Sequence, residues 1–342
     1  MKKYLFLLLS IFIFHINSCN PGKSHIYKDT RLYMNTIVSI TAVSESKDKA
    51  EKAIKAAFDE INKIQKLTDF YSGKSEISLI NKNAGVSPVK VSGTVIEILE
   101  KALDVSEKTK GSFDITIGAI SSLYDFSKNI KPSNKEILKR LKYVNYKNII
   151  IDRKNQTVFL KKKGMLIDTG GITKGYASDK AAEVLKINGI KSGIIAVGGE
   201  IHAFGTNPDN KLWKIGIKDP DPNSEENDII AAIELSDSSI STSGDYQRFF
   251  ILDGKKYHHI LDPKTGMPAD LCRSVTVIGK ENSMTDALAT GIFVLGPEEG
   301  IKILKENGLN GVIIDKKNNL IITPELDKKI EFTSNCSKYN KS

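Results

Sequence analysis

Apolar residues recur at helical spacing in four stretches of this chain. In the first of them, Ala50, Ile54 and Ile61 fall on one face of a helix. Gly296 and Pro297 follow the last of them, as is common where a helix ends. The pattern therefore predicts helices over residues 47–67, 94–109, 174–188 and 284–294.

Short alternating or β-branched runs predict strands among these helices. Two hairpins are expected, around residues 153–156 and 316–319, because strand-like runs flank polar turns there. The expected strands cover residues 36–43, 148–151, 157–160, 193–197, 213–217, 229–235, 249–252, 274–278, 312–314 and 320–322.

The order of these elements indicates the fold class. Helices and strands are intermixed without strict alternation, which is typical of an α+β fold with substantial antiparallel sheet. The sequence shows no internal repeat or long linker, and the segment 219–228, rich in Pro, Asp and Asn, is typical of a surface loop. Length alone allows two ordinary domains or one large one.

The first twenty residues have the composition of a secretory signal. Two lysines precede an apolar run over residues 5–14, which is shorter than the roughly 20 residues of a transmembrane helix. Cys19 follows the small Ser18, which favours a lipoprotein signal over residues 1–18 with Cys19 as the acylated residue. The alternative is an uncleaved anchor. Either way we expect an exported, membrane-held protein, in a bacterium if Cys19 is lipidated.

Polar segments flank the expected folded unit of residues 29–332. Residues 19–28 are interpreted as a tether, and residues 333–342 as a polar tail without regular structure. Three cysteines are too few for a disulfide scaffold and do not form a zinc-type cluster. Because Cys336 lies in the polar tail, we expect it and Cys272 to be free thiols.

Composition and charge narrow the possible functions. The chain has 342 residues, of which 27% are charged and 40% hydrophobic, and this balance excludes a disordered polymer and a multi-span membrane protein. Removing the signal's two lysines leaves 48 basic and 41 acidic residues, so the formal charge falls from +9 to +7. The remaining lysines are dispersed and not interleaved with aromatic residues. We therefore expect a solvated basic surface and no nucleic-acid partner.

A strand-to-helix turn within residues 167–179 is the first candidate for chemistry. Asp168 ends the strand, and Gly170 and Gly171 allow close approach to the backbone before the helix begins. A helix N-terminus presents free N–H groups and partial positive charge, which suits a phosphate. Lys174 opposes the helix dipole, and an anionic ligand would offset that cost. The alternative is a tight turn with a solvated lysine.

Asp286 and Thr290 form the second candidate. They lie four residues apart and so share one face of the expected helix. A carboxylate and a hydroxyl are hard oxygen donors of the kind that Mg²⁺ accepts together with substrate phosphates. The alternative is a first-turn charge and a hydroxyl bonded within the helix.

Two adjacent histidines, His258 and His259, precede an Asp-Pro-Lys-Thr-Gly turn at residues 262–266. An imidazole with a pKa near neutral can serve as a general base. It can also bind zinc, although no second pair of ligands at metal-binding spacing is found in the sequence. The hydroxyl-rich residues 241–246 are interpreted as a further loop able to contact a ligand.

Together these motifs resemble the ApbE family, the FAD:protein FMN transferases. The resemblance runs from about residue 34 to about residue 322. It rests on six segments in the family's order, at residues 111–118, 168–179, 197–201, 241–246, 259–268 and 286–296. One departure is that the family's usual Met-Gly-Thr reads Met34-Asn35-Thr36 here.

The resemblance implies an α+β, T-fold-like structure with mixed or antiparallel sheets, packed helices and two lobes around a flavin cleft. It also implies a single catalytic unit that cuts the pyrophosphate of FAD in a Mg²⁺-dependent step. FMN would pass to a threonine of an acceptor protein, typically a subunit of a membrane redox complex, and AMP would be released.

The resemblance also assigns residues. The metal would meet the Gly171 carbonyl, the Asp286 carboxylate and the Thr290 hydroxyl, and His259 would be the base for the incoming threonine. FAD would be held by residues from across the chain, namely Met34, Tyr71, Ser112, Phe113, Asp114, Asp168, Lys174 and Leu261.

Two other functions compete with transfer. The chain could hydrolyse FAD to free FMN and AMP, or it could be a lipoprotein that binds FAD without chemistry. An aromatic residue at Tyr71 would cover bound FAD, which favours retention and transfer. In each case we expect a bacterial lipoprotein that faces the periplasm or the cell exterior.

Overall fold

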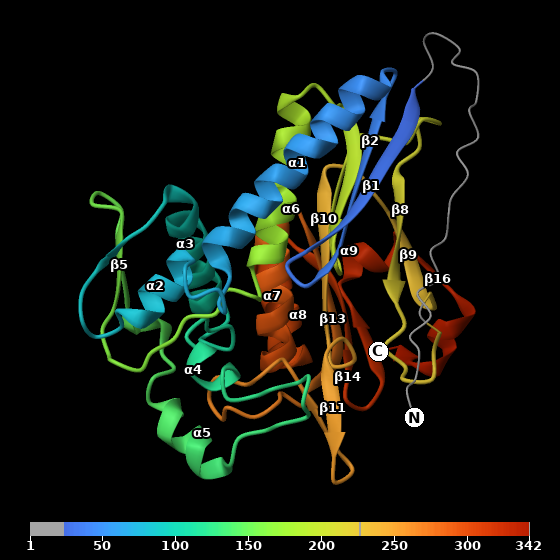
Figure 1. The fold of residues 1–342 in the computed structure, drawn as a ribbon. Helices are drawn as coiled ribbons and strands as arrows, with labels where there is room; N and C mark the ends of the chain where they lie inside the picture. The colour runs from blue at the N-terminus through green and yellow to red at the C-terminus, as the bar shows by residue number, and fades with distance from the viewer. Residues whose placement is uncertain (1–23, 226, 342) are drawn as a thin grey trace, which may run out of the picture.

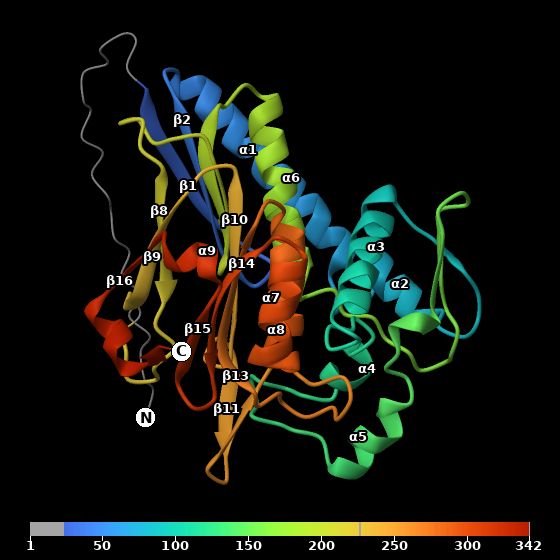
Figure 2. The same cartoon turned by 180° about the vertical axis from the view of Figure 1, so that it is seen from behind.

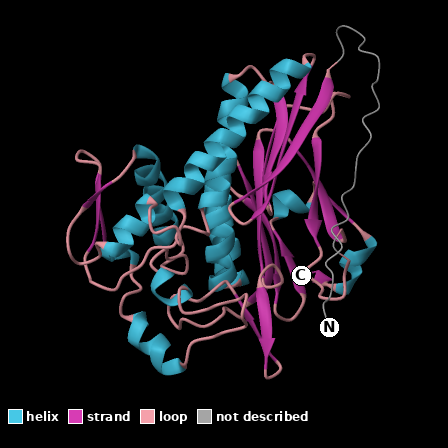
Figure 3. Cartoon of the chain, viewed as in Figure 1, coloured by secondary structure: helices cyan, strands magenta, loops and turns pink. Residues whose placement is uncertain are grey.

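The computed structural model describes residues 24–225 and 227–341 and shows a mixed α+β fold, as predicted (Figures 1 and 3). A nine-stranded sheet runs through the molecule, with antiparallel neighbours except for the parallel last pair. Its order is β1 (His25–Tyr33), β2 (Thr36–Ser44), β6 (Ser192–Val197), β7 (Glu200–Phe204), β10 (Ser238–Gly244), β13 (Cys272–Gly279), β14 (Asn310–Asp315), β15 (Asn319–Ile322) and β17 (Asn340–Lys341).

Helices cover one face of this sheet (Figures 1 and 2). They are α1 (Lys47–Thr68), α6 (Thr173–Ile187), α7 (Asn282–Leu295) and α8 (Pro297–Glu306). The apolar face of α1 is fully buried at Ala57, Phe58 and Ile61. It shares one hydrophobic core with alternate residues of β2, such as Val38 and Ile40.

A smaller sheet covers the opposite face. It consists of β16 (Ile330–Phe332), β9 (Ile229–Leu235) and β8 (Trp213–Lys218), with α9 (Pro324–Asp327) beside it. The strict alternation of β14 explains the two layers, because Ile313 joins the core under the helices while Val312 and Ile314 join the core under the small sheet.

A second group of elements lies beside the helices, on the left of Figure 1. It contains α2 (Glu76–Lys82), α3 (Gly93–Lys108), α4 (Gly118–Ser121), α5 (Asn134–Leu141), η1 (Tyr146–Asn148) and the sheet β3 (Val89–Lys90), β5 (Thr157–Leu160), β4 (Ile149–Asp152). The hairpin β11 (Phe249–Leu252) and β12 (Lys255–His258) packs against α4 and α5 of this group and buries Phe250 and Tyr257 in a third hydrophobic cluster.

The four predicted helices are confirmed as α1, α3, α6 and α7. Both predicted hairpins are also confirmed, since β4 pairs with β5 and β14 with β15. In the part of the chain that the structure describes, none of the helices is long and apolar enough to cross a membrane.

The structure differs from the expected boundaries at both ends. The segment interpreted as a tether, residues 19–28, already enters β1 at His25. The segment expected to be an irregular tail, residues 333–342, is folded over its described part as η2 (Ser334–Lys338) and β17, because Tyr339 is buried and donates a hydrogen bond to the buried Asp219 carboxylate. Cys272 and Cys336 are free thiols, whereas the signal at 1–18 and Cys19 lie outside the described residues.

Candidate active site

The helix α6 starts at Thr173 as predicted, but the strand expected to end at Asp168 does not form, since Leu166 makes only an isolated bridge with Ile117. Asp168 shapes the turn, because its carboxylate accepts hydrogen bonds from the Gly170 N–H (3.0 Å) and the Ser121 hydroxyl (3.1 Å). No side chain of the turn caps α6. The positive end of the α6 dipole is therefore left for groups outside the turn.

Lys174 points from the first turn of α6 to Glu200, the first residue of β7, and forms an ion pair with it. Glu200 is only 2% exposed, which makes this a buried carboxylate. Burial alone would lower the pKa of Lys174, but the Glu200 and Asp286 carboxylates outweigh it and raise that pKa above the ordinary lysine value. Lys174 therefore stays charged where a phosphate would bind.

The structure brings the three expected metal-binding residues together. Asp286 accepts a hydrogen bond from the Gly175 N–H at 2.9 Å, so α7 crosses the start of α6 at this point. Thr290 lies one turn further along α7. A methyl group placed on Gly171 would lie 3.5 Å from the Thr290 hydroxyl, so these two residues are neighbours.

Asp286 is buried without full charge compensation. It is 3% exposed, and burial, followed by the nearby Glu200 carboxylate, raises the pKa of Asp286 well above the ordinary aspartate range. Among the described residues no cluster of three or more His, Cys, Asp or Glu side chains could hold a metal. The expected donor set is different in kind, with one carboxylate, one hydroxyl and one backbone carbonyl.

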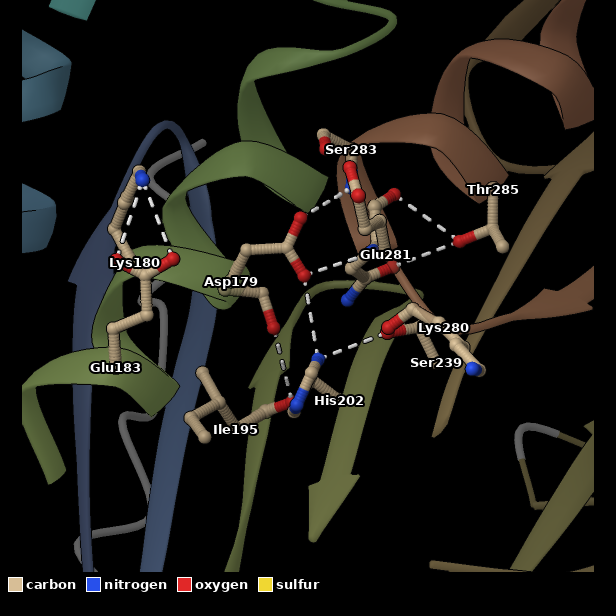
Figure 4. Close-up of polar contacts among 12 residues, drawn as sticks. Asp179, Lys180, Glu183, Ile195, His202, Ser239, Lys280, Glu281, Ser283 and Thr285 are labelled. Atoms are coloured by element: carbon tan, nitrogen blue, oxygen red, sulfur yellow. Dashed lines mark hydrogen bonds and ion pairs between the residues drawn. The ribbon is translucent and has the colours of Figure 1, made fainter. Parts of the chain in front are cut away.

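Asp179 on α6 fixes the start of α7 (Figure 4). Its two carboxylate oxygens accept the N–H groups of Asn282 (2.7 Å) and Ser283 (2.8 Å), and one of them also lies 3.3 Å from His202 Nδ1. His202 is held in turn by Ser239 at 2.9 Å. The sequence motif contained Asp179, but its role could not be recognised before the two helices were placed side by side.

The hydroxyl-rich segment 241–246 was expected to be a loop, and this is wrong for most of it, because β10 continues to Gly244. The strand is central, and the hydroxyls of Ser241 and Ser243 pair with side chains of α7. Ser241 Oγ bonds Asn282 Oδ1 at 2.7 Å, and Ser243 Oγ lies 3.1 Å from Thr290 Oγ1. β10 thus contacts the expected metal-binding side of α7.

His259 follows β12 directly, and both its N–H (3.1 Å) and its Nδ1 (3.3 Å) meet the Arg248 carbonyl. Burial, together with His258 and Lys174, lowers the pKa of His259 to about 4, so its imidazole is neutral near pH 7. His258 is engaged internally through Nε2 and the Ala269 carbonyl at 2.8 Å. Of the two histidines, His259 is the one free to act as a base.

The expected flavin residues at the edge of the site occupy turns. Met34 and Asn35 connect β1 to β2 with φ of 51° and 57°. Such angles favour glycine or asparagine, which explains how Asn35 replaces the family's usual glycine. Tyr71 lies in the turn between α1 and α2 and is largely exposed, and partial desolvation of its hydroxyl, followed by the negative charge of Asp168, raises its pKa.

The remaining expected flavin residues are more enclosed. Asp114 is buried and accepts hydrogen bonds from Thr116 and from the Tyr146 N–H (2.9 Å), so its side chain stabilises the local fold.

The buried Phe113 ring lies against Gly171, where an added methyl group would sit 3.1 Å from it. Ser112 is buried beside it, and Leu261 is buried in the third hydrophobic cluster.

Comparisons with known proteins place this chain in a family. The sequence model of the ApbE family matches residues 34–313. The chain is 31% identical over 293 residues to a FAD:protein FMN transferase of Haemophilus influenzae, covering 83% of each protein. It is 28% identical over 322 residues to a FAD:protein FMN transferase of Vibrio cholerae, covering 92% of this chain and 94% of that protein.

Solved structures agree with the sequence relatives. The ApbE protein of Thermotoga maritima superposes with a TM-score of 0.83 at 30% identity, covering 89% of this chain and 99% of that one. The flavin transferase ApbE of Vibrio cholerae gives a TM-score of 0.78 at 26% identity, covering 92% and 99%. By its matched segments, its fold and its relatives, this chain belongs to the ApbE family.

Proposed function

We propose that this chain transfers FMN from FAD to a threonine hydroxyl of an acceptor protein in a Mg²⁺-dependent reaction that releases AMP. It is a FAD:protein FMN transferase, as its relatives at about 30% identity are named. The observation that carries the proposal of Mg²⁺-dependent transfer is that α7 brings Asp286 to the start of α6, where Lys174 also lies, and His259 is near enough for the charge of Lys174 to lower its pKa.

The reaction balances with the groups at this site. The threonine Oγ attacks the FMN phosphorus of FAD, a new phosphoester bond forms, and the bond from that phosphorus to the bridging oxygen breaks. The electron pair leaves with the phosphate of AMP, and the hydroxyl proton passes to His259, which is neutral and can accept it. Lys174, charged at pH 7, offsets the negative charge of the pyrophosphate.

The residues present fit a hard divalent cation. Asp286 is a buried carboxylate that lacks full compensation, and Thr290, one turn further along α7, and its neighbour Gly171 would add a hydroxyl and a carbonyl oxygen. When bound, Mg²⁺ supplies positive charge to the pyrophosphate and to the departing AMP. Asp179 and Ser243 support this arrangement, since the first fixes the start of α7 and the second contacts Thr290.

The flavin would lie in a T-fold-like arrangement between the two groups of elements. Met34 and Lys174 belong to the large sheet and its helices, whereas Tyr71 lies on the segment that leads from α1 into the second group and Phe113 lies within that group, between α3 and α4. Tyr71 is 72% exposed, so its ring is available to cover a bound flavin. This favours retention of FAD for transfer over its hydrolysis.

The proposed setting is an exported bacterial lipoprotein that faces the periplasm or cell exterior and is anchored through Cys19. It rests on the basic start, the short apolar run and the Ser18-Cys19 pair in the sequence. The acceptor would then be an exposed subunit of a membrane redox complex.

The test is a transfer assay with the mature chain, FAD, Mg²⁺ and a candidate acceptor subunit. We expect one FMN per acceptor by intact mass, located on a threonine by peptide sequencing, with one AMP released. His259→Asn should keep FAD binding but lose the adduct. Equal amounts of free FMN and AMP without an adduct would indicate a hydrolase, and FAD retained unchanged with several acceptors would indicate a binding protein.

A further inference from the structure

Glu200 is a buried carboxylate with one unused oxygen. It follows the Gly198-Gly199 turn between β6 and β7 and is 2% exposed. One carboxylate oxygen, Oε1, pairs with Lys174, whereas Oε2 has no hydrogen-bond partner among the described residues. Buried carboxylate oxygens are rarely left without a partner, so Oε2 requires one that residues 24–225 and 227–341 do not provide.

The charges around Glu200 indicate what kind of partner is missing. Glu200 and Asp286 are two buried carboxylates that act on each other, and Lys174 is the cationic side chain that acts on both. One ammonium group offsets only one of the two negative charges. An uncompensated buried charge is costly, so the pair of acids favours an additional positive charge.

We propose that Glu200 is a further residue of the cation site, where its Oε2 supplies a second carboxylate to the divalent cation, directly or through a water molecule. The proposal rests on the proposed function, since it extends the same site. Because Lys174 already uses Oε1, Lys174 and the cation share Glu200 when FAD is absent. Removing the charge of Lys174 should therefore change the affinity of the cation for Glu200.

This sharing predicts that two substitutions change the Mn²⁺ affinity in opposite directions. Glu200→Gln keeps the size of the side chain but removes its charge, so we expect Mn²⁺ to bind the FAD-free protein about 10–100-fold more weakly. Lys174→Met removes the competing ammonium group, so Mn²⁺ should bind more tightly than to wild type. The probe is Mn²⁺ alone, measured by calorimetry and by electron paramagnetic resonance, with Mg²⁺ as the competitor.

The matched control is Glu183→Gln, which removes an acid on the same helix as Lys174. Glu183 pairs with Lys180 and its side chain is 57% exposed, so Mn²⁺ affinity should not change. Glu200→Asp, which keeps the charge, should bind Mn²⁺ better than Glu200→Gln and serves as a second variant if the amide variant folds poorly.

The outcomes separate this inference from the function it extends. Unchanged Mn²⁺ affinity in Glu200→Gln, with Asp286→Asn impaired, would overturn the role of Glu200 and leave the transferase proposal intact. Weaker Mn²⁺ binding in Lys174→Met would likewise overturn the sharing of Glu200. If wild type binds no Mn²⁺, both the metal dependence and the role of Glu200 are wrong.

Discussion

Gly175 donates its backbone N–H to Asp286 at 2.9 Å and leaves no room for a side chain of its own. A methyl group at Gly175 would lie 2.2 Å from the Asn282 carbonyl oxygen and 2.8 Å from Asp286 Cβ. The absence of a side chain on α6 therefore decides how closely α7, with its expected metal ligand, approaches.

Gly175→Ala should force α6 and α7 apart. We expect a loss of at least about 1–3 kcal/mol in the free energy of unfolding, the usual cost of overpacking, together with a loss of FMN transfer. Urea denaturation measures the first and the transfer assay the second. Gly93→Ala at the start of α3 is the control, because a methyl group there meets open space. Equal stability of the two variants would contradict this account of the helix contact.

Asp286→Asn should abolish FMN transfer without unfolding the protein. The amide can still accept the Gly175 hydrogen bond, but it cannot offer a charge to a cation. We expect transfer to fall by more than about 100-fold, beyond the loss typical of an outer partner of a metal. Mg²⁺ should raise the melting temperature of wild type but not of the variant.

The same variant should be no less stable than wild type at pH 8 without metal. The folded-state pKa of Asp286 is raised, so its ionisation opposes folding as the pH rises above the ordinary aspartate pKa of about 4. A marked loss of stability in Asp286→Asn under these conditions would mean that the carboxylate is well compensated by the protein itself.

The pKa of His259 gives a pH prediction. Because its folded-state pKa is about 4, the imidazole should titrate well below the ordinary value of about 6.5. The stability linked to the neutral form is fully present above pH 6.5 and is lost as the pH falls towards 4. Nuclear magnetic resonance titration, assigned with His259→Asn, measures the pKa, and a value at or above 6.5 would contradict the desolvation of this half-buried ring.

The folded C-terminal segment predicts a cost for losing one hydroxyl. Tyr339 donates to Asp219, whose side chain is fully buried and also pairs with Lys338 at 3.0 Å. Tyr339→Phe should lower the free energy of unfolding by about 1–3 kcal/mol, because a buried acceptor loses a partner. Thermal melting measures this change. In the control variant Tyr27→Phe, which removes a hydroxyl without a hydrogen bond among the described residues, the free energy of unfolding should change little.

Helices and strands whose apolar residues recur at regular spacing could be predicted from the sequence. Elements held by hydrogen bonds between buried polar side chains could not. The helix α1 has its buried residues at regular helical spacing and was predicted almost to the residue. The strand β10 has Ile240 as its one large buried apolar side chain and otherwise buries serines, of which Ser241 and Ser243 bond side chains of α7. Only the assembled structure supplies those partners, so the sequence pattern indicated a loop.

The site was predictable to a similar extent. Asp286 and Thr290 could be placed on one helix face from their spacing, and the resemblance added Gly171 and His259. Glu200 and Asp179 could not be assigned roles, because each acts on a residue far away in the sequence, Lys174 in one case and the start of α7 in the other. Their effect depends on tertiary contacts, which local pattern does not encode.

The length of the strand β1 affects how close an acceptor protein must come to the proposed flavin site. This strand is nine residues long and ends at the Met34 turn, so it rises about 30 Å from His25 to that turn. A strand paired along its whole length with β2 is a stiff spacer, whereas a flexible linker would let the site approach a surface. If the chain is anchored ahead of residue 24, β1 keeps its own start and the Met34 turn about this far apart, so an acceptor threonine has to reach the far end of the strand.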